Sequence, residues 1–174
     1  MTAPRFVPLT CPTCSGNLLG RAQDRVAFCT SCARGYRVDG DAITTVPVLV
    51  AGDAREADLA LPFWRRGSLA WPAFTSARPL LLARTVSLHL AEWPIAPIGG
   101  APWPLGARLA PETFEQALVF AGLDAPSAGA PLELVAVAVR HVDRRWHLPG
   151  ECAVLYPDDV LEGTALLEAA LARP

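Results

Sequence analysis

The chain has 174 residues, of which 52% are hydrophobic, and it carries a formal net charge of −2. That length suits one domain or two small ones, and the lack of a run of about 18 uninterrupted apolar residues argues against a membrane-spanning helix. Residues 1–46 hold five arginines against three aspartates, an excess that four thiolates around one Zn²⁺ would cancel, so the composition offers no basic platform for nucleic acid.

Four cysteines near the N-terminus form two Cys-x-x-Cys pairs, Cys11 with Cys14 and Cys29 with Cys32, separated by fourteen residues. Two such pairs supply the tetrahedral four-sulfur shell of structural zinc. Because four thiolates leave no open coordination position, we expect one structural Zn²⁺ without catalytic chemistry. Its binding should contribute on the order of 10–16 kcal/mol, so the first domain should be unfolded without metal.

Two disulfides or a redox-active dithiol are the alternatives for these cysteines. Met1 is followed by Thr-Ala-Pro-Arg, which lacks the charged start, apolar core and cleavage site of an export signal. We therefore expect a cytoplasmic chain. Reduced thiols in that compartment favour a bound metal over a disulfide.

The composition divides the chain into three parts that together predict the α+β class. We expect a zinc ribbon over residues 1–50, an acidic connector or short exposed helix over 51–61, and a small antiparallel-sheet domain with two or three helices over 62–174. Seventeen prolines should keep the helices short and leave much irregular backbone.

Within the ribbon, glycines and alternating apolar residues predict the local structure. Strands are expected at 17–20, at 26–28, at 36–38, and through Ile43 and 46–50. Gly16 and Gly35 each follow a cysteine pair, and we expect them to supply the φ freedom that the two knuckles need.

The segment 76–93 fits either a strand or a helix by its apolar spacing. Ser76 as a cap and Pro79 near the first turn favour the helix. A loop should follow over 94–104 because it is rich in proline and glycine. Pro111 should then open a short helix that ends before Gly122.

The segment 132–142 is almost wholly apolar and β-branched at alternate positions, which predicts a central strand. Residues 151–156 should be its antiparallel neighbour. Asp158 or Asp159 can cap a final helix that continues to Leu171.

Four short segments around the cysteines are similar to those of a known family. They are Leu9-Thr-Cys11-Pro-Thr-Cys14-Ser-Gly16-Asn-Leu18, Phe28-Cys29, Gly35-Tyr36-Arg-Val38 and Val46-Pro-Val-Leu-Val50. They resemble the small zinc-ribbon family that activates RNA and protein methyltransferases, and the ribbons that begin some bacterial methyltransferases. The resemblance covers about residues 5–50. It implies that the four cysteines are the zinc ligands and that the ribbon lends apolar and strand-edge surface to an enzyme partner.

The rest of the chain carries a weaker resemblance. Phe63-Trp64-Arg65 and Trp71-Pro-Ala-Phe74 look like segments of uncharacterised bacterial ribbon proteins. Residues 51–174 contain no strand followed by a glycine-rich turn that could hold S-adenosylmethionine, so a fused methyltransferase is not expected.

Aromatic and arginine side chains in the second part are the candidate partner-binding residues. Trp64, Arg65, Arg66 and Trp71 are chosen because Trp and Arg often anchor protein interfaces. Phe63 and Phe74 are expected to fill the core instead.

A second group of polar residues raises the question of catalysis. His141, His147 and Cys152 lie near Asp143 and Glu151, as a second metal site or a Cys/His nucleophile would require. The sequence does not fix on which side of the strands they lie, and a cysteine beside apolar residues usually packs as a small core residue. No catalytic role is expected there, and His89 is read as a satisfied core or surface histidine.

These observations predict a non-catalytic zinc-ribbon adaptor or accessory subunit that binds a protein partner, or a second copy of itself, in a larger assembly. The first alternative is an activating subunit of a methyltransferase. The second is a nucleic-acid-binding zinc-ribbon protein.

Overall fold

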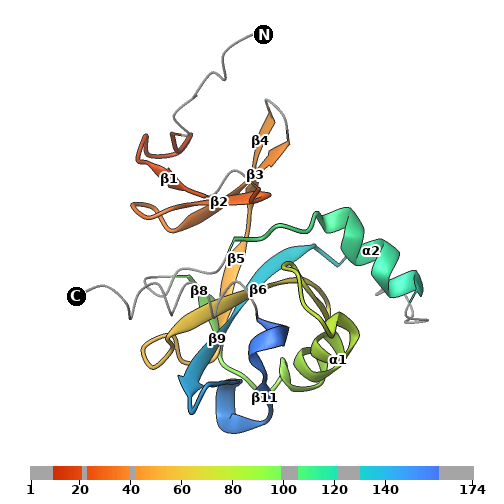
Figure 1. The fold of residues 1–174 in the computed structure, drawn as a ribbon. Coiled ribbons are helices and arrows are strands. Elements are labelled where there is room, and N and C mark those ends of the chain that lie inside the picture. Colours follow the sequence, from red (N-terminus) through yellow and green to blue (C-terminus); the bar gives the residue numbers. More distant parts are fainter. Residues whose placement is uncertain (1–9, 21–22, 40–41, 99–105, 121–129, 161–174) are drawn as a thin grey trace, which may run out of the picture.

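The computed structural model describes residues 10–20, 23–39, 42–98, 106–120 and 130–160. Over these ranges the chain forms two sheets and two α-helices, which confirms the predicted α+β class (Figure 1). A four-stranded ribbon, coloured red to orange, lies above a seven-stranded sheet that curls into a half-barrel. No α-helix in the described ranges has both the length and the apolar character needed to cross a bilayer.

The ribbon is an antiparallel sheet with the strand order β1-β2-β3-β4. Its strands are β1 (Leu18–Leu19), β2 (Val26–Cys29), β3 (Arg34–Asp39) and β4 (Ala42–Val46). The first three confirm the expected positions, although β3 begins two residues earlier than predicted. In register, Leu18 lies opposite Cys29, and Cys29 lies opposite Arg34, so the second knuckle is built directly between β2 and β3.

The seven-stranded sheet is organised around one long strand, β9. The strands are β5 (Val48–Ala51), β6 (Leu59–Arg66), β7 (Leu69–Pro72), β8 (Ile95–Pro97), β9 (Glu133–Val142), β10 (Arg145–His147) and β11 (Val154–Leu155). Strand β9 pairs with β5, β6 and β10, and only the β5 pairing is parallel. This confirms the central strand predicted over 132–142.

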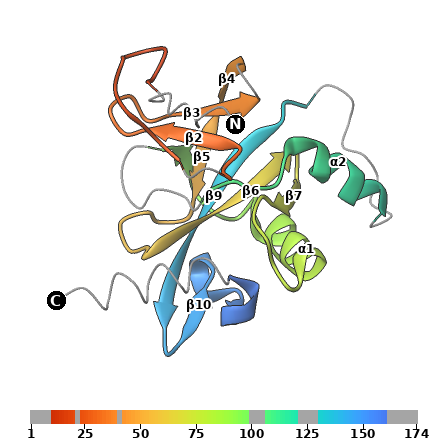
Figure 2. The ribbon, with the colours of Figure 1, turned by 45° about the horizontal axis from the view of Figure 1, so that its top comes forward.

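Two helices cover opposite faces of this sheet. They are α1 (Pro79–His89) and α2 (Pro111–Phe120). Strand β6 runs between them in Figure 2. Leu82 and Val86 of α1 pack in one hydrophobic cluster, whereas Phe114 and Leu118 of α2 pack in a second one. Both helices therefore confirm their predicted positions.

Burial on both faces explains why β9 is apolar at every position of its middle. Successive side chains of a strand point to opposite faces. Val135 and Val137 lie in the cluster with α1, and Leu134 and Ala136 lie in the cluster with α2. A strand that is covered on both sides has no reason to alternate with polar residues.

The apolar stretch expected to complete the ribbon is split between the two sheets. Strand β4 ends at Val46, and β5 begins at Val48 and pairs in parallel with β9, where Val48 lies opposite Leu134. Pro47 is the only residue between them. The expected boundary at residue 50 therefore falls within β5, and the expected connector over 51–61 overlaps the end of β5 and the start of β6.

The prediction that residues 151–156 form the antiparallel neighbour of β9 was wrong. Strand β10, not the segment 151–156, pairs with β9, and β11 pairs only with β10. Asp143 and Arg144 make the tight turn with φ of 49° and 62°. Aspartate is common at the first of two such left-handed positions in a hairpin, but glycine normally occupies the second, so a sequence with Arg144 there does not indicate the turn.

The start of α1 also differs in detail from the prediction. The N-cap residue is Arg78, which makes no side-chain capping bond, and Pro79 is the first helical residue. The Oγ of Ser76 accepts a hydrogen bond from the N–H of Arg78, two residues before the helix.

Two further expectations concern the connections. The loop expected over 94–104 includes β8, which pairs with β5. Of the final helix, the structure describes only the short 3₁₀ turn Pro157–Asp159, and its continuation to Leu171 lies outside the described residues, as does Gly122.

Candidate metal centre

The two knuckles bring the four cysteine sulfurs together. Their Sγ atoms all lie within 4.8 Å of one another. Cys11 and Cys32 are separated by 3.6 Å, and Cys14 and Cys29 by 3.4 Å. Four sulfurs at about 2.3 Å from a tetrahedral Zn²⁺ are about 3.8 Å apart, whereas a disulfide needs about 2.05 Å. All four thiols are free, so this cluster could hold one metal ion, as the spacing predicted.

Each knuckle closes in the same way. The N–H of Ser15 donates to the carbonyl of Cys11, and the N–H of Ala33 donates to the carbonyl of Cys29, both at 2.9 Å. The residue that donates follows the second cysteine of its pair and has a left-handed backbone, with φ of 59° at Ser15 and 55° at Ala33. This conformation turns the chain back so that both sulfurs of a pair face one point.

The predicted role of the two glycines needs correction. Neither Gly16 nor Gly35 has a left-handed φ. What they supply is space, because a Cβ on Gly16 would lie 2.7 Å from Ser31 Oγ, and one on Gly35 would lie 2.4 Å from Val48 Cγ2. Gly35 thus allows the ribbon to approach the second sheet closely.

A buried tyrosine that was not among the predicted site residues contacts the cluster. The hydroxyl of Tyr36 lies 3.1 Å from Cys11 Sγ and 2.7 Å from Thr13 Oγ1. Arg34 Nη1 donates to Thr13 Oγ1 at 3.1 Å. The sequence feature that could have indicated this contact is a tyrosine four residues after Cys32, on the strand that leaves the second knuckle.

These contacts determine which groups carry protons. Burial raises the pKa of Cys11, but hydrogen bonds from the Tyr36 hydroxyl and from the N–H groups of Cys14 and Thr13 outweigh it and lower that pKa to about 6. The hydrogen bond to Cys11 raises the pKa of Tyr36, so the hydroxyl keeps its proton at neutral pH. Cys11 is therefore largely a thiolate at neutral pH, the form that binds metals.

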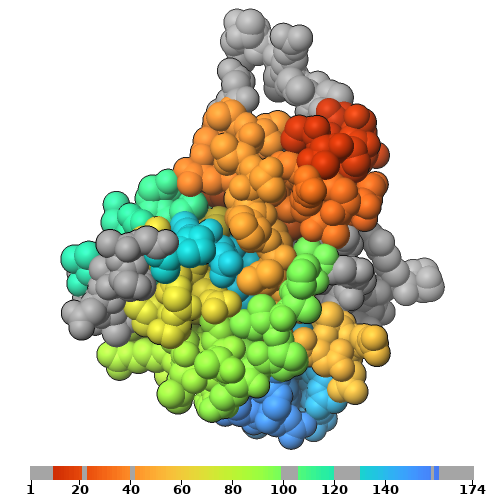
Figure 3. Space-filling model, turned by 180° about the vertical axis from the view of Figure 1, so that it is seen from behind, coloured from red at the N-terminus to blue at the C-terminus, as the bar shows by residue number. Residues whose placement is uncertain are grey.

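The cluster is anchored on the second sheet. Val26 and Phe28 of β2 belong to the same hydrophobic cluster as Trp64, and the space-filling view shows the red and orange ribbon resting directly on the rest of the molecule (Figure 3). The N–H of Arg25 donates to the carbonyl of Ala107 at 2.6 Å. The ribbon and the second sheet therefore share one core.

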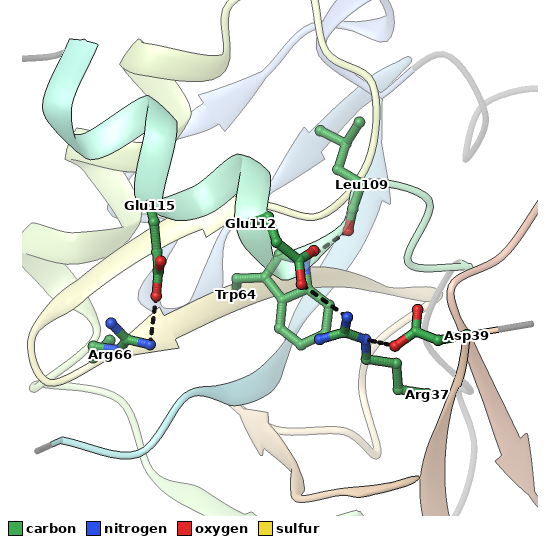
Figure 4. A network of polar contacts seen from close by, with 7 residues as sticks. All are labelled: Arg37, Asp39, Trp64, Arg66, Leu109, Glu112 and Glu115. Carbon is green, nitrogen blue, oxygen red and sulfur yellow. Dashed lines mark hydrogen bonds and ion pairs between the residues drawn. The ribbon is translucent and has the colours of Figure 1, made fainter. Parts of the chain in front are cut away.

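The four candidate partner-binding residues have different surroundings. Trp64 is 1% exposed and donates from Nε1 to the carbonyl of Leu109 at 2.7 Å (Figure 4). Trp64 is thus packed inside the chain. Arg65 pairs with Glu133 at 3.8 Å, Arg66 pairs with Glu115 at 2.9 Å, and Trp71 is half-buried. Partner binding through the latter three stays a prediction.

Phe63 and Phe74 confirm their expected core role. Both are almost fully buried, and their rings meet edge to face with centroids 5.7 Å apart. His89 is hydrogen-bonded to Glu92 at 3.0 Å and stacks on Trp93, which agrees with its interpretation as a satisfied histidine.

The second polar group does not assemble into a metal site. His141 packs on the ring of Trp146 with centroids 4.7 Å apart, whereas His147 lines a cavity of about 240 Å³ elsewhere. Partial burial raises the pKa of the exposed Cys152, which favours its protonated thiol. Within the described ranges, the cysteine cluster is the only group of three or more Cys, His, Asp or Glu side chains close enough to share an ion.

Comparison with known proteins finds no match among family models, curated proteins or solved structures. The resemblance to the methyltransferase activators therefore stays a prediction, and the metal centre is argued from its own geometry.

Proposed function

We propose that this protein is a non-catalytic adaptor or accessory subunit whose ribbon, held by one structural Zn²⁺, forms a rigid platform for a protein partner. The observation that carries the proposal is the cluster of four sulfurs within 4.8 Å of one another. Thiolates are the ligands that zinc prefers in structural sites, and four of them saturate its tetrahedral shell. A saturated ion has no position for a substrate or an activated water.

Packing supports the role of a platform. A small ribbon alone has little core, but this one shares a hydrophobic cluster with the second sheet through Val26 and Phe28. The metal and the shared core together would hold the outer face of the ribbon in a fixed orientation. Fixed surfaces lose less conformational entropy when they bind a partner.

Exposed apolar side chains support partner binding. Leu19 and Ile43 are 49% and 40% exposed on the ribbon, and Leu88 of α1 is 71% exposed. Leu19 and Ile43 belong to β1 and β4, the two edge strands of the ribbon, and an exposed strand edge is a surface on which another chain can pair. The methyltransferase-activating role would be one case of this function.

The proposal is tested on the purified full chain. We expect one zinc per chain by elemental analysis, and tetrahedral thiolate bands after replacement by Co²⁺. Ile43→Asp and Leu88→Asp test the surface, with Thr44→Asp on the neighbouring exposed position as the control. A partner recovered in stoichiometric amount should be lost with Ile43→Asp at unchanged thermal stability, and its loss with Leu88→Asp alone would contradict a platform on the ribbon. A chain without metal, or a monomer that retains no partner from native lysate, would contradict the proposal.

A further inference from the structure

Three side chains connect the surface of the ribbon to one of the four sulfurs. Arg34 Nη1 lies 3.1 Å from Thr13 Oγ1, Thr13 Oγ1 lies 2.7 Å from the Tyr36 hydroxyl, and that hydroxyl lies 3.1 Å from Cys11 Sγ. Arg34 and Thr13 are exposed, whereas Tyr36 and Cys11 are 1% and 2% exposed. The chain of contacts therefore begins in solvent and ends at a buried ligand.

The two ends of this series of contacts are compatible with one direction of hydrogen bonding. A guanidinium can only donate, so Thr13 accepts from Arg34 and its single hydroxyl proton is available for the oxygen of Tyr36. Tyr36 then has its own proton for a sulfur, and Cys11 is closer than Cys32, which lies 3.9 Å away. A metal-bound thiolate has no proton and can only accept.

Cys11 is the sulfur that gains most from such a donor. Four thiolates around one Zn²⁺ carry a net charge of −2, which must be compensated where water is excluded. Cys14 is exposed and can be solvated, whereas Cys11 is buried. Cys29 is also buried, but Tyr36 makes no contact of this kind with it among the described hydrogen bonds.

We propose that Tyr36 is a positioning residue of the metal centre: supported by Thr13 and Arg34, its hydroxyl delivers a directed hydrogen bond to the Cys11 sulfur and strengthens metal retention. This inference rests on the proposed zinc site. Partners of this kind behind the direct ligands typically change metal affinity by 10–100-fold when they are removed.

The decisive variant is Tyr36→Phe, which removes the hydroxyl and keeps the ring. Zinc affinity is measured by competition with a chromophoric chelator, and the sulfur-to-metal charge-transfer band is measured after loading with Co²⁺. We expect affinity to fall at least about 10-fold and the band to move to lower energy, because a thiolate without its donor is more easily oxidised. Tyr156→Phe is the matched control, since Tyr156 is 49% exposed and contacts Arg78 and Arg145 away from the cysteines.

A second variant keeps the test decisive if Tyr36→Phe does not fold. Thr13→Val changes an exposed residue and removes only the middle of the chain of hydrogen bonds, so it should shift both readouts in the same direction by a smaller amount. Unchanged affinity and band energy in the folded variant would overturn the inference. A loss of affinity without a band shift would also overturn it, because Tyr36 would then act by packing. If the unaltered protein bound neither Zn²⁺ nor Co²⁺, the proposed function itself would fail first.

Discussion

Arg37 of the ribbon and Glu112 of helix α2 are joined by a hydrogen bond of 2.8 Å, although 75 residues separate them in sequence. The Nε of the same guanidinium pairs with Asp39 at 2.5 Å, so Arg37 lies between two carboxylates (Figure 4). Glu112 is in the first turn of its helix, where backbone N–H groups also attract a negative charge. One polar bridge thus reinforces the apolar contact between ribbon and second sheet.

This bridge should contribute modestly to stability. Arg37→Met and Glu112→Gln, combined in a double-mutant cycle by urea unfolding, should give a coupling energy of about 0.2–1 kcal/mol, because the pair is partly exposed. The pKa of Glu112 is lowered by the hydrogen bond from its own backbone N–H and then by Arg37, which together outweigh burial. The coupling should therefore be complete above about pH 5 and fade as pH falls through that lowered pKa. A coupling that grows in acid would contradict this account.

Removal of the metal should destabilise both sheets. Val26 and Phe28 lie in one cluster with Trp64, so loss of the ribbon would expose apolar surface of the second sheet. We expect a strong chelator to lower the melting temperature of the whole chain in one transition and to shift tryptophan fluorescence to longer wavelength. Cys29→Ser should act in the same way, and Cys152→Ser should have no effect. A second sheet that melts at its original temperature would contradict this prediction.

The close approach at Gly35 should tolerate no side chain. In Gly35→Ala the new Cβ would lie 2.4 Å from Val48 Cγ2 and 3.2 Å from the carbonyl of Val46, which should destabilise the fold by about 1–3 kcal/mol. Val48→Ala removes the nearest atom, so the double variant should lose less than the sum of the single variants. Gly20→Ala is the control, since its nearest neighbour lies 3.3 Å away. Strict additivity in urea unfolding would contradict the contact.

The knuckles should become more stable when their left-handed residues are glycine. Ala33 has a φ of 55°, a conformation that disfavours residues with a side chain by about 1–2 kcal/mol. Ala33→Gly should therefore raise the melting temperature of the metal-loaded protein by a few degrees. Ala42→Gly, in strand β4, should lower it, because glycine weakens a regular strand. A decrease in both variants would show that Ala33 is not strained.

The buried carboxylate of Asp159 should stabilise the fold in a pH-dependent way. It accepts hydrogen bonds from Arg78 Nε at 2.8 Å and from the N–H of Tyr156 at 2.9 Å, and it is 1% exposed. Asp159→Asn should lower the free energy of unfolding at pH 7 by about 1–3 kcal/mol. Glu115→Gln, on the surface of α2, should lower it by less than about 1 kcal/mol.

The direction of the pH effect follows from the pKa of Asp159. Burial raises this pKa, but the hydrogen bonds from Arg78 and Tyr156 outweigh burial and hold it below its usual value. The stabilisation is therefore complete above the unfolded-state pKa of about 3.9 and is lost as pH falls through the lower folded-state pKa. The difference between Asp159→Asn and the unaltered chain should shrink in acid. A difference that widens there would contradict the assignment.

Local chemistry explains what the sequence could predict. Cys11, Cys14, Cys29 and Cys32 stand in two pairs at the spacing typical of zinc sites, so the sequence alone predicts that their sulfurs form one cluster. Pro111 opens α2, because the first turn of a helix tolerates a residue without an N–H. The continuous apolar character of 132–142 identifies a strand that is covered on both faces.

Contacts between distant residues explain what the sequence could not predict. The run Val46–Val50 fits a ribbon strand equally well, and only pairing with β9, more than eighty residues later, assigns Val48 to the second sheet. Arg144 takes part in a hairpin turn with a φ of 62°, against its own preference for negative φ. The role of Tyr36 depends on the meeting of β3 with the first knuckle, which no local pattern encodes.

Pro47, the single residue between β4 and β5, also limits how this molecule can be dissected. A fragment that ends at Val46 would leave Val26 and Phe28 in water, and one that begins at Val48 would uncover the surface on which they rest. Neither fragment is therefore expected to fold when it is moved alone into another protein. A graft or a recombination event that preserves the fold must carry both sheets together.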